Sequence, residues 1–358
     1  MTNANKMNTL PLSRERMLRA KVAYTPRHVD LDAAVMLLVG DDVEPKAGDL
    51  VLARIEKIGH HGALELTTGR RSTLFPGDEI VVCYGNRYAP DQFEAEVPPN
   101  LASCHLVAAG GIAAQALSWH VNIKPPTAIV PIGLLADVKG KRINLSGAAV
   151  AKLGHSYPLP YTVAVVGTSM NAGKTTTVAN LIYGLTCAGL KVGAAKVTGT
   201  GSGKDTWFMG DAGARLALDF TDAGFPSTFR LTVAELEGIF ITLTSHLAKA
   251  GVDVIILEVA DGLYQQETAA LLCSATFKKM VNSVIFAAGD AMGAMAGVEW
   301  LRRKDLPVVA VSGLLTASPL AVIEAANATG VTIIDKNMLR DITIATKLGI
   351  SAKIEPSS

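Results

Sequence analysis

The chain has 358 residues, which is enough for about two domains of ordinary size. Hydrophobic residues make up 49% of the chain and charged residues 18%, and this composition excludes a disordered or fibrous protein. Lys and Arg total 33 against 32 Asp and Glu, so there is no excess positive charge to hold nucleic-acid phosphates or an anionic membrane. We therefore expect no nucleic-acid or membrane partner, and a small-molecule substrate instead.

The cysteines and the N-terminus indicate the compartment. Cys83, Cys104, Cys187 and Cys273 are widely spaced, which favours reduced and mostly buried thiols. The N-terminus is polar and lacks the apolar segment of a secretory signal. The longest uncharged stretch, 97–123, is interrupted by prolines and polar residues, so it does not resemble a membrane span. We expect a cytoplasmic protein that forms a homo-oligomer.

The N-terminal part of the chain has the pattern of a β-rich domain. Residues 1–30 are polar and irregular and predict an arm. Within 31–153, apolar and polar residues alternate over 47–59, and Gly, Pro and Asp turn signals recur over 62–88. Such spacing is typical of a small antiparallel barrel or sandwich. A short helix is expected over 112–119.

A different rhythm begins after the segment 154–162, in which two prolines and a glycine indicate a hinge. Apolar strands are followed by segments of helical length, which is typical of a parallel sheet covered on both faces. Residues 158–358 therefore predict a doubly wound α/β domain with a mainly parallel sheet. Its expected strands are 161–167, 190–197, 252–260, 281–289, 306–313 and 330–335, and its expected helices include 174–188, 231–251 and one that starts at Ser318-Pro319.

The first strand of this domain leads into a glycine-rich turn and then into Gly173-Lys174-Thr175-Thr176. Backbone N–H groups of such a loop and of the helix start point at an anion, and the helix dipole adds to the attraction. We expect Lys174 to reach the β- and γ-phosphates of a nucleotide and the Thr175 hydroxyl to complete a Mg²⁺ shell. The predicted nucleotide-binding residues are Gly167, Thr168, Ser169, Met170, Asn171, Ala172, Gly173, Lys174, Thr175 and Thr176.

The turn departs from the standard pattern G-x-x-x-x-G-K-[ST]. That pattern requires a glycine where Thr168 stands, and the upstream glycine, Gly167, lies one residue earlier. One alternative is a glycine-rich turn that merely starts a helix. The order of strand, loop, Gly-Lys-Thr-Thr and helix favours the phosphate site.

The segment GTSMNAGKTT (167–176) resembles the P-loop of dethiobiotin synthetase and of the cobyrinic acid amidase group, where Gly-Thr opens a loop that is one residue longer. The segments GAAKVTGTGSGKD (193–205) and ILEVADGL (256–263) resemble the ends of the second and third strands of dethiobiotin synthetase. The C-terminal half also resembles a bacterial P-loop family that includes D-glutamate N-acetyltransferase. The resemblance covers residues 158–358 only.

This resemblance implies an ATP- and Mg²⁺-dependent enzyme that activates a small carboxylate-type substrate by phosphoryl transfer, as a ligase or synthetase does. One alternative is an acyltransferase whose P-loop holds the phosphates of coenzyme A. Another is a nucleotide-gated switch or maturation factor with slow hydrolysis. The chain contains no Asn-Lys-x-Asp guanine signature, which favours ATP over GTP.

Two residues at strand ends are candidates for the chemistry of this site. Glu258 closes an apolar strand, and a carboxylate at the carboxyl end of a parallel strand faces the ligand crevice. We interpret it as a metal ligand, with Asp261 as the alternate. Lys196 ends another strand and is predicted to be catalytic, because its charge would stabilise the transferred phosphoryl group.

The Thr-Gly-rich run 198–203 is interpreted as a mobile loop that closes over the phosphates. Lys204 and Asp205 follow it and are further catalytic candidates, with a solvated loop as the alternative. Asp211 is a further candidate metal ligand.

In the N-terminal part, Asn86, Arg87 and Tyr88 stand near Asp91 and form a polar-aromatic cluster in an expected loop. The cluster is interpreted either as a substrate contact or as an ordinary hairpin end.

Overall fold

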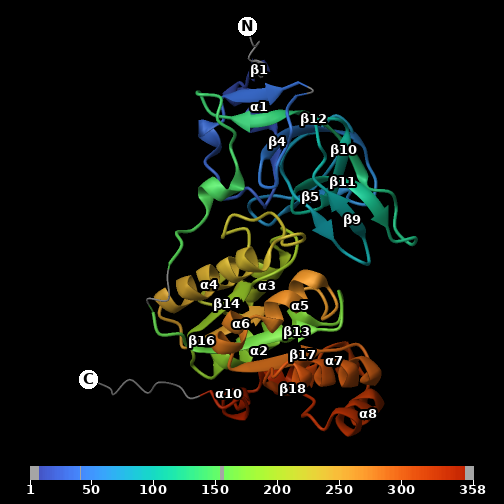
Figure 1. Cartoon of the computed structure of the whole chain (residues 1–358), viewed down its shortest axis with the longest axis vertical. Coiled ribbons are helices and arrows are strands. Elements are labelled where there is room, and N and C mark those ends of the chain that lie inside the picture. Colours follow the sequence, from blue (N-terminus) through green and yellow to red (C-terminus); the bar gives the residue numbers. More distant parts are fainter. Residues whose placement is uncertain (1–7, 41, 154–156, 351–358) are drawn as a thin grey trace. The chain divides into compact units, whose positions relative to one another are not determined.

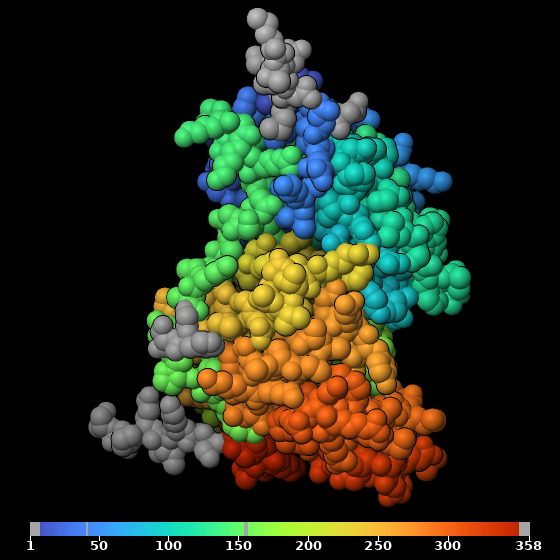
Figure 2. Space-filling model, viewed as in Figure 1, coloured from blue at the N-terminus to red at the C-terminus, as the bar shows by residue number. Residues whose placement is uncertain are grey.

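The computed structural model describes residues 8–40, 42–153 and 157–350, and the remaining residues are drawn in grey (Figure 1 and Figure 2). The chain divides into two compact units. Unit 1 comprises Met1–Val150, Thr200–Lys204 and Phe220–Phe229, and unit 2 comprises Ala151–Gly199, Asp205–Asp219 and Arg230–Ser358. Two short segments of the C-terminal half therefore belong to the β-rich unit.

Unit 1 is built on a ten-stranded sheet, five strands of which close into a barrel. The barrel runs β12–β4–β7–β11–β10, and β10 pairs again with β12. All of these pairs are antiparallel except the parallel pair of β7 and β11. The strands of unit 1 are β1 (Asn8–Pro11), β2 (Lys21–Val22), β3 (Met36–Val39), β4 (Leu50–Lys57), β5 (Ala63–Glu65), β6 (Arg71–Thr73), β7 (Glu79–Tyr84), β8 (Arg87–Tyr88), β9 (Phe93–Glu96), β10 (Cys104–Ala108), β11 (Ile112–Trp119) and β12 (Thr127–Ala136).

Buried side chains alternate between the two faces of the strands in the closed sheet. In β7, Ile80, Val82 and Tyr84 pack into one buried cluster, whereas Val81 and Cys83 pack into another on the opposite face. Successive side chains of a strand point to opposite faces, so one set fills the barrel interior and the other binds the covering segments. The expectation of a small β-rich N-terminal domain is confirmed.

Two expectations for this region are wrong. Within the expected arm, β1 pairs with β3 and β2 pairs with β7, so these residues belong to the sheet, while residues 1–7 lie outside the described part. The helix expected over 112–119 is strand β11. Its sequence IAAQALSW is rich in helix formers, but β11 pairs with β7, β9 and β10, and this tertiary pairing overrides local propensity.

Unit 2 contains a six-stranded sheet in the order β15–β14–β16–β13–β17–β18, and every neighbouring pair is parallel. The predicted α/β fold with a parallel sheet is confirmed. The strands are β13 (Tyr161–Gly167), β14 (Val192–Lys196), β15 (Leu216–Asp219), β16 (Val254–Glu258), β17 (Ser283–Ala287) and β18 (Val308–Ser312).

Helices connect these strands and cover the sheet (Figure 1). Right-handed crossovers place α2 on one face and α4 and α7 on the other. Helices α9 and α10 pack on α2, and α5 and α6 pack on α4. The helices are α2 (Lys174–Cys187), α3 (Lys204–Asp211), α4 (Val233–Lys249), α5 (Gln266–Cys273), α6 (Ala275–Met280), α7 (Ala291–Arg303), α8 (Pro319–Thr329), α9 (Lys336–Arg340) and α10 (Ile344–Lys347), and unit 1 contains the short helix α1 (Arg14–Arg19).

The sixth strand differs from the expectation. The segment 330–335 makes only an isolated bridge, between Ile333 and Val311 of β18, and the sixth strand is β15 at the opposite edge of the sheet. Ser318 caps α8 as predicted, with Pro319 in its first turn. Of the expected hinge, residues 154–156 lie outside the described part.

Two further expectations can be compared with the structure. All four cysteines are free thiols, but Cys187 and Cys273 are exposed, so the expectation of mostly buried thiols fails for half of them. In the described ranges, no helix combines the length and hydrophobicity needed to cross a membrane.

The strand order fixes where a ligand can bind in unit 2. The connection from β13 leads to one side of the sheet, to β14, whereas the connection from β16 leads to the other side, to β17. Such a change of direction opens a crevice at the carboxyl ends of the strands. The loops after β13, β14 and β16 meet there.

Candidate functional site

The loop between β13 and α2, residues 168–173, is held by the end of one neighbouring strand and by the loops that follow two others. Thr168 N–H donates to the carbonyl of Ala287, the last residue of β17, at 3.0 Å. The carbonyl of Ala172 accepts from Leu314 N–H at 3.1 Å, after β18. After β16, a Cβ built on Gly262 would lie 2.2 Å from the Thr168 carbonyl oxygen, so only a glycine fits there. The loop is therefore held in shape from three sides.

The loop ends in left-handed backbone and leads directly into α2. Asn171 has φ 64° and Gly173 has φ 98°. Gly173 is the N-cap of α2 and supplies no side-chain hydrogen bond. Because the first N–H groups of a helix have no acceptor within the helix, those of Lys174, Thr175 and Thr176 are free to bind an anion. This backbone geometry is suited to binding an anion.

Lys174 is the first residue of α2, and its side chain lies across the loop. Lys174 is only 6% exposed. The ammonium donates to the carbonyl oxygen of Ser169 at 2.7 Å and to that of Asp261 at 2.6 Å. Burial lowers the pKa of Lys174, and the negative charges of Glu258 and Asp261 oppose this effect. One N–H of the ammonium is left for a ligand oxygen.

Thr175 and Glu258 form the second element of the site. The Thr175 hydroxyl donates to Oε1 of Glu258 at 2.9 Å. Glu258 ends β16 and is 2% exposed. Its other oxygen, Oε2, is buried and has no hydrogen-bond partner among the residues that the structure describes. Burial of the carboxyl and the negative charge of Asp205 raise its pKa to about 7.

A buried oxygen without a partner is costly unless a ligand satisfies it. Mg²⁺ in nucleotide sites is held by one or two protein oxygens together with substrate phosphates and water. Glu258 Oε2 beside the Thr175 hydroxyl fits this requirement. Within the described ranges, no group of three or more His, Cys, Asp and Glu side chains gathers to hold a metal ion alone.

Lys196 ends β14 and lies in the same charged group. It forms an ion pair with Asp205 of α3, and both side chains are more than four-fifths buried. Burial alone would lower the pKa of Lys196, but the negative charges of Asp205 and Glu258 outweigh it, so its pKa is raised. The structure thus brings together five of the predicted residues: Lys174, Thr175, Lys196, Asp205 and Glu258.

The Thr-Gly-rich run after β14 differs from the mobile loop that we expected. The Thr198 hydroxyl donates to the carbonyl of Ala260. The next residues, Thr200–Lys204, belong to unit 1. There Gly201 N–H donates to the carbonyl of Pro226 at 2.9 Å, and Gly203 N–H donates to Oε2 of Glu65 at 3.0 Å. Backbone hydrogen bonds therefore hold this segment in place.

Two predicted residues are not brought to the charged group. Lys204 is exposed at the first position of α3. Asp211 is exposed at the last position of α3, and no contact among the described residues links it to Thr175 or Glu258. Asp261, the alternate metal ligand, lies beside the site and holds Lys174 through its backbone carbonyl.

Sequence reasoning missed the glycines that support the loop. Gly262 follows β16, and Gly293 lies in the first turn of α7, where an added Cβ would be 3.1 Å from the methyl group of Thr168. The available signal for Gly262 was its place directly after Asp261, a short distance beyond the strand that ends at Glu258. Nothing in the sequence around Gly293 indicated a neighbour more than a hundred residues away.

No protein-family model matches the chain, and no curated protein matches it. Among solved structures, the signal recognition particle 54 kDa protein from Aeropyrum pernix K1 in complex with GDP is 21% identical, with a TM-score of 0.37 over 54% of this chain and 47% of that one. The signal recognition particle receptor FtsY from Elizabethkingia anophelis in complex with GDP is 16% identical, with a TM-score of 0.38 over 54% of this chain and 62% of that one. Chloroplast FtsY from Physcomitrella patens is 16% identical, with a TM-score of 0.36 over 53% of this chain and 62% of that one.

The chain thus spans between 47% and 62% of the length of these structures. With TM-scores this low, the likeness carries no argument about this chain. What can be said of the site rests on its own geometry: a clamped loop, an uncapped helix start, a buried lysine and a threonine–glutamate pair with one unsatisfied oxygen.

Proposed function

We propose that unit 2 binds a nucleoside triphosphate together with Mg²⁺ and transfers its terminal phosphoryl group. The observation that carries this proposal is the Thr175–Glu258 pair, with its unsatisfied buried oxygen, directly beside Lys174 at the start of α2. This arrangement offers a cation, backbone N–H donors and hard oxygen ligands from the first turn of α2 and the end of β16. A phosphate chain needs all three.

Each residue has a distinct role in this proposal. The N–H groups of Lys174, Thr175 and Thr176 bind phosphate oxygens, and the Lys174 ammonium neutralises the β- and γ-phosphates. Thr175 and Glu258 are the protein groups that would hold Mg²⁺, which when bound neutralises charge on the phosphates as the leaving group departs. A ligand cation there would keep Glu258 ionised, since nearby positive charge lowers the pKa of a carboxyl.

The Lys196–Asp205 pair supports a finer proposal about the acceptor. The Asp205 carboxylate forms an ion pair with the buried ammonium of Lys196. The same ammonium is therefore suited to binding a substrate carboxylate. We propose that a small carboxylate displaces Asp205 and that its oxygen attacks the γ-phosphorus. The bond from that phosphorus to the bridging oxygen then breaks, and an acyl phosphate and a nucleoside diphosphate form. We propose ATP as the donor, because the sequence lacks the guanine signature.

A second candidate is a nucleotide-gated switch, and a specific observation favours it. Gly199 and Asp205 belong to unit 2, but the five residues between them, Thr200–Lys204, belong to unit 1. A change in the Lys196–Asp205 pair on nucleotide binding would therefore pull on a segment that is bonded within the β-rich unit. In this case slow hydrolysis would serve as a timer.

Binding is tested by thermal unfolding of the full chain with ATP, GTP or acetyl-coenzyme A in the presence of Mg²⁺. A ligand that binds only the folded state raises the melting temperature with its concentration. We expect a rise with a nucleoside triphosphate that Lys174→Ala removes. The matched control is Lys191→Ala, an exposed lysine just before β14. A rise with acetyl-coenzyme A alone would instead support acyl transfer, and no rise with any of them would overturn the nucleotide proposal.

The acceptor is tested by release of the diphosphate. A phosphotransferase should release it rapidly only when a small carboxylate is supplied, whereas a switch should hydrolyse slowly without one. Gly110→Ala sharpens the distinction, because its Cβ would lie 2.2 Å from the Gly201 carbonyl oxygen and would displace the 200–204 segment. The control is Gly147→Ala, which meets nothing within 4 Å. If Gly110→Ala changes the rate of unstimulated hydrolysis and Gly147→Ala does not, the switch is favoured.

A further inference from the structure

We propose that unit 1 carries a separate binding site for a neutral, hydroxyl-rich ring, such as one sugar unit, at the pocket formed by β8, β9 and the end of β11. This inference is independent of the nucleotide proposal. The pocket has a volume of about 340 Å³ and is lined in part by Tyr88, Gln92, Glu94, Ser118, Trp119 and His120. A volume near the lower limit for small-molecule sites suits one ring rather than a large cofactor.

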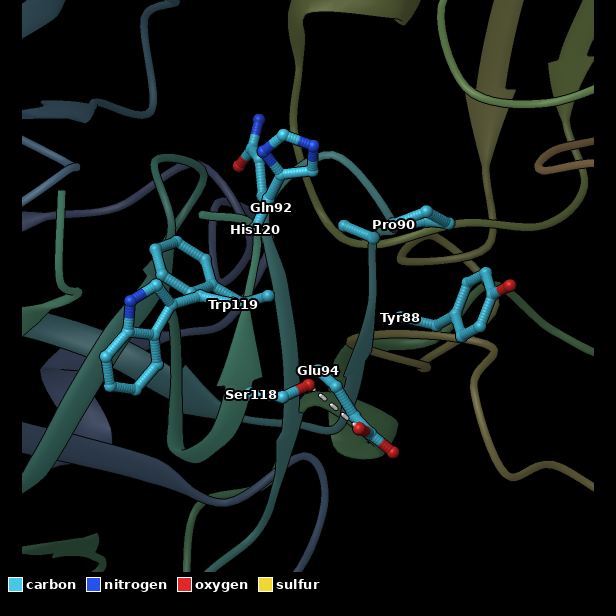
Figure 3. Close-up of a pocket in the computed structure, with 9 residues that line it drawn as sticks. Tyr88, Pro90, Gln92, Glu94, Ser118, Trp119 and His120 are labelled. Carbon is cyan, nitrogen blue, oxygen red and sulfur yellow. Dashed lines mark hydrogen bonds between the residues drawn. The ribbon is translucent and has the colours of Figure 1, made fainter. Parts of the chain in front are cut away.

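Figure 3 shows how the pocket is arranged. The Trp119 indole lies on one side, and Pro90 and Tyr88 lie on the other. Trp119 is 45% exposed. An exposed indole in a concave site offers a flat face on which the C–H groups of a sugar ring can stack.

Polar groups stand at the two ends of the pocket. His120 and Gln92 lie together at one end, and Ser118 and Glu94 lie at the other (Figure 3). The Ser118 hydroxyl donates to Oε2 of Glu94 at 3.0 Å. This bond orients the carboxylate and leaves its Oε1 as an acceptor for a ligand hydroxyl.

The end formed by His120 and Gln92 supplies donors. Nδ1 of His120 accepts from the backbone N–H of Asn122 at 3.2 Å, so the neutral ring carries its hydrogen on Nε2. The side-chain oxygen of Gln92 accepts from Arg87 at 2.7 Å, so its NH₂ group is left as a donor. The pocket therefore presents donors at one end and an acceptor at the other. A hydroxyl group both donates and accepts, and a ring bearing several hydroxyls can satisfy both ends.

The charge of the lining selects among possible rings. Glu94 is the one carboxylate among the residues that line the pocket, and the lining includes neither lysine nor arginine. A phosphorylated or acidic sugar would be repelled by Glu94, and a simple ammonium ion could not accept from His120 and Gln92. A neutral polyol ring meets neither difficulty.

The frame of the pocket is set before a ligand arrives. His120 N–H donates to the carbonyl of Gln92 at 2.9 Å, and Gln92 N–H donates to that of Ala89 at 2.8 Å. Phe93, which also lines the pocket, is fully buried, and its ring contacts those of His60 and His61 at centroid distances of 5.6 Å. A fixed frame lowers the entropy lost on binding.

The test is saturation-transfer NMR on the full chain with methyl glycosides of glucose, galactose, mannose and N-acetylglucosamine, with glucose 6-phosphate and adenosine as comparison ligands. We expect at least one neutral glycoside to bind, and we expect Trp119→Ala to weaken its binding by about tenfold or more. The matched control is Trp207→Ala, since Trp207 is also 45% exposed but lies on α3. Glu94→Gln should allow the sugar phosphate to bind, because it removes the charge and keeps the shape.

Three results would overturn the proposal: no neutral glycoside binds the wild type, Trp119→Ala leaves the binding unchanged, or adenosine binds more tightly than every glycoside. The last would mean that the indole stacks on a planar base instead. Circular dichroism of each variant checks that a loss of binding is not a loss of folding.

Discussion

The two units differ in how their sheets end and in where their charged side chains gather. In unit 1 the barrel sheet closes on itself, and its interior is filled by side chains such as Val51, Ile80 and Leu106. In unit 2 the sheet is open, helices cover both faces, and the carboxyl ends of the strands are left to the loops. Charged residues of unit 2 gather at those ends. A closed barrel offers no such edge, and the candidate site of unit 1 is a pocket formed by β8, β9 and the end of β11.

The two units also differ in how charged groups are buried. Unit 1 buries the carboxylates of Asp49 and Asp222, each in a separate ion pair with an arginine. In unit 1, burial lowers the pKa of His61 to about 3 and raises that of Cys104 to about 12, so both groups are neutral. In unit 2, Lys174, Lys196 and Glu258 are buried as an interacting group of charges. Buried charges that stabilise one another at strand ends are typical of functional sites, whereas neutral buried groups are typical of a core.

The largest effect that this comparison predicts is at Lys196. Lys196→Ala should slow phosphoryl transfer by about 100-fold, since it removes the buried charge that we propose holds the attacking carboxylate. Single-turnover rates at saturating nucleotide measure the effect. The control is Lys204→Ala, an exposed lysine for which a change within about twofold is expected. Equal effects of the two variants would contradict the assignment of Lys196 to the site.

The next effect concerns the clamp on the loop. Gly262→Ala should weaken nucleotide binding by about thirtyfold, because the new methyl group must displace the Thr168 carbonyl. Isothermal titration with the nucleotide measures it. Gly238→Ala is the control: Gly238 is exposed within α4, a Cβ there meets nothing within 4 Å, and the variant should be about 1 kcal/mol more stable. Unchanged affinity in Gly262→Ala would mean that the clamp does not shape the phosphate site.

The two units should respond to pH with opposite signs. The pKa of folded Glu258 is raised from 4.5 to about 7, so the ligand-free protein binds this proton more tightly than the unfolded chain and loses stability as pH rises through that interval. The pKa of folded His61 is lowered from 6.5 to about 3, so stability is lost as pH falls below 6.5. Between pH 4.5 and 6.5 each effect should amount to on the order of 2 kcal/mol.

Urea unfolding across that pH range separates the two contributions. Glu258→Gln should remove the loss of stability on raising the pH, and His61→Gln should remove the loss on lowering it. The comparison fails if both variants shift the pH profile in the same direction.

The smallest effect is at the helix caps. Thr232 and Glu235 form a capping box at the start of α4, a helix of 17 residues with a buried face. Thr232→Ala should cost about 1 kcal/mol of unfolding free energy, measured by urea denaturation. Ser13 caps α1 in unit 1, a helix of six residues with no buried side chain. Ser13→Ala should cost only a few tenths of a kcal/mol, because little tertiary packing depends on that helix. A larger cost for Ser13→Ala would contradict this view of the two helices.

The amino-acid sequence was sufficient for features that depend on neighbours along the chain. The strand, glycine-rich turn and helix from Tyr161 to Cys187 were predicted because periodicity and turn chemistry are local. Five of the six strands of unit 2 were predicted for the same reason, whereas β15 was not predicted. Lys196 and Glu258 were predicted from their positions at the carboxyl ends of strands. In a parallel sheet these ends lie on the same side, so the two residues come close together.

Tertiary structure decided what depends on residues far apart in the chain. Strand β11 is helix-forming by composition, and its three partner strands make it a strand. The bond from Gly203 to Glu65 and the clamp of Gly262 on Thr168 join residues whose separation leaves no trace in any local pattern. Local propensities differ by only about 1 kcal/mol per residue, so such long-range contacts determine the outcome wherever the two disagree.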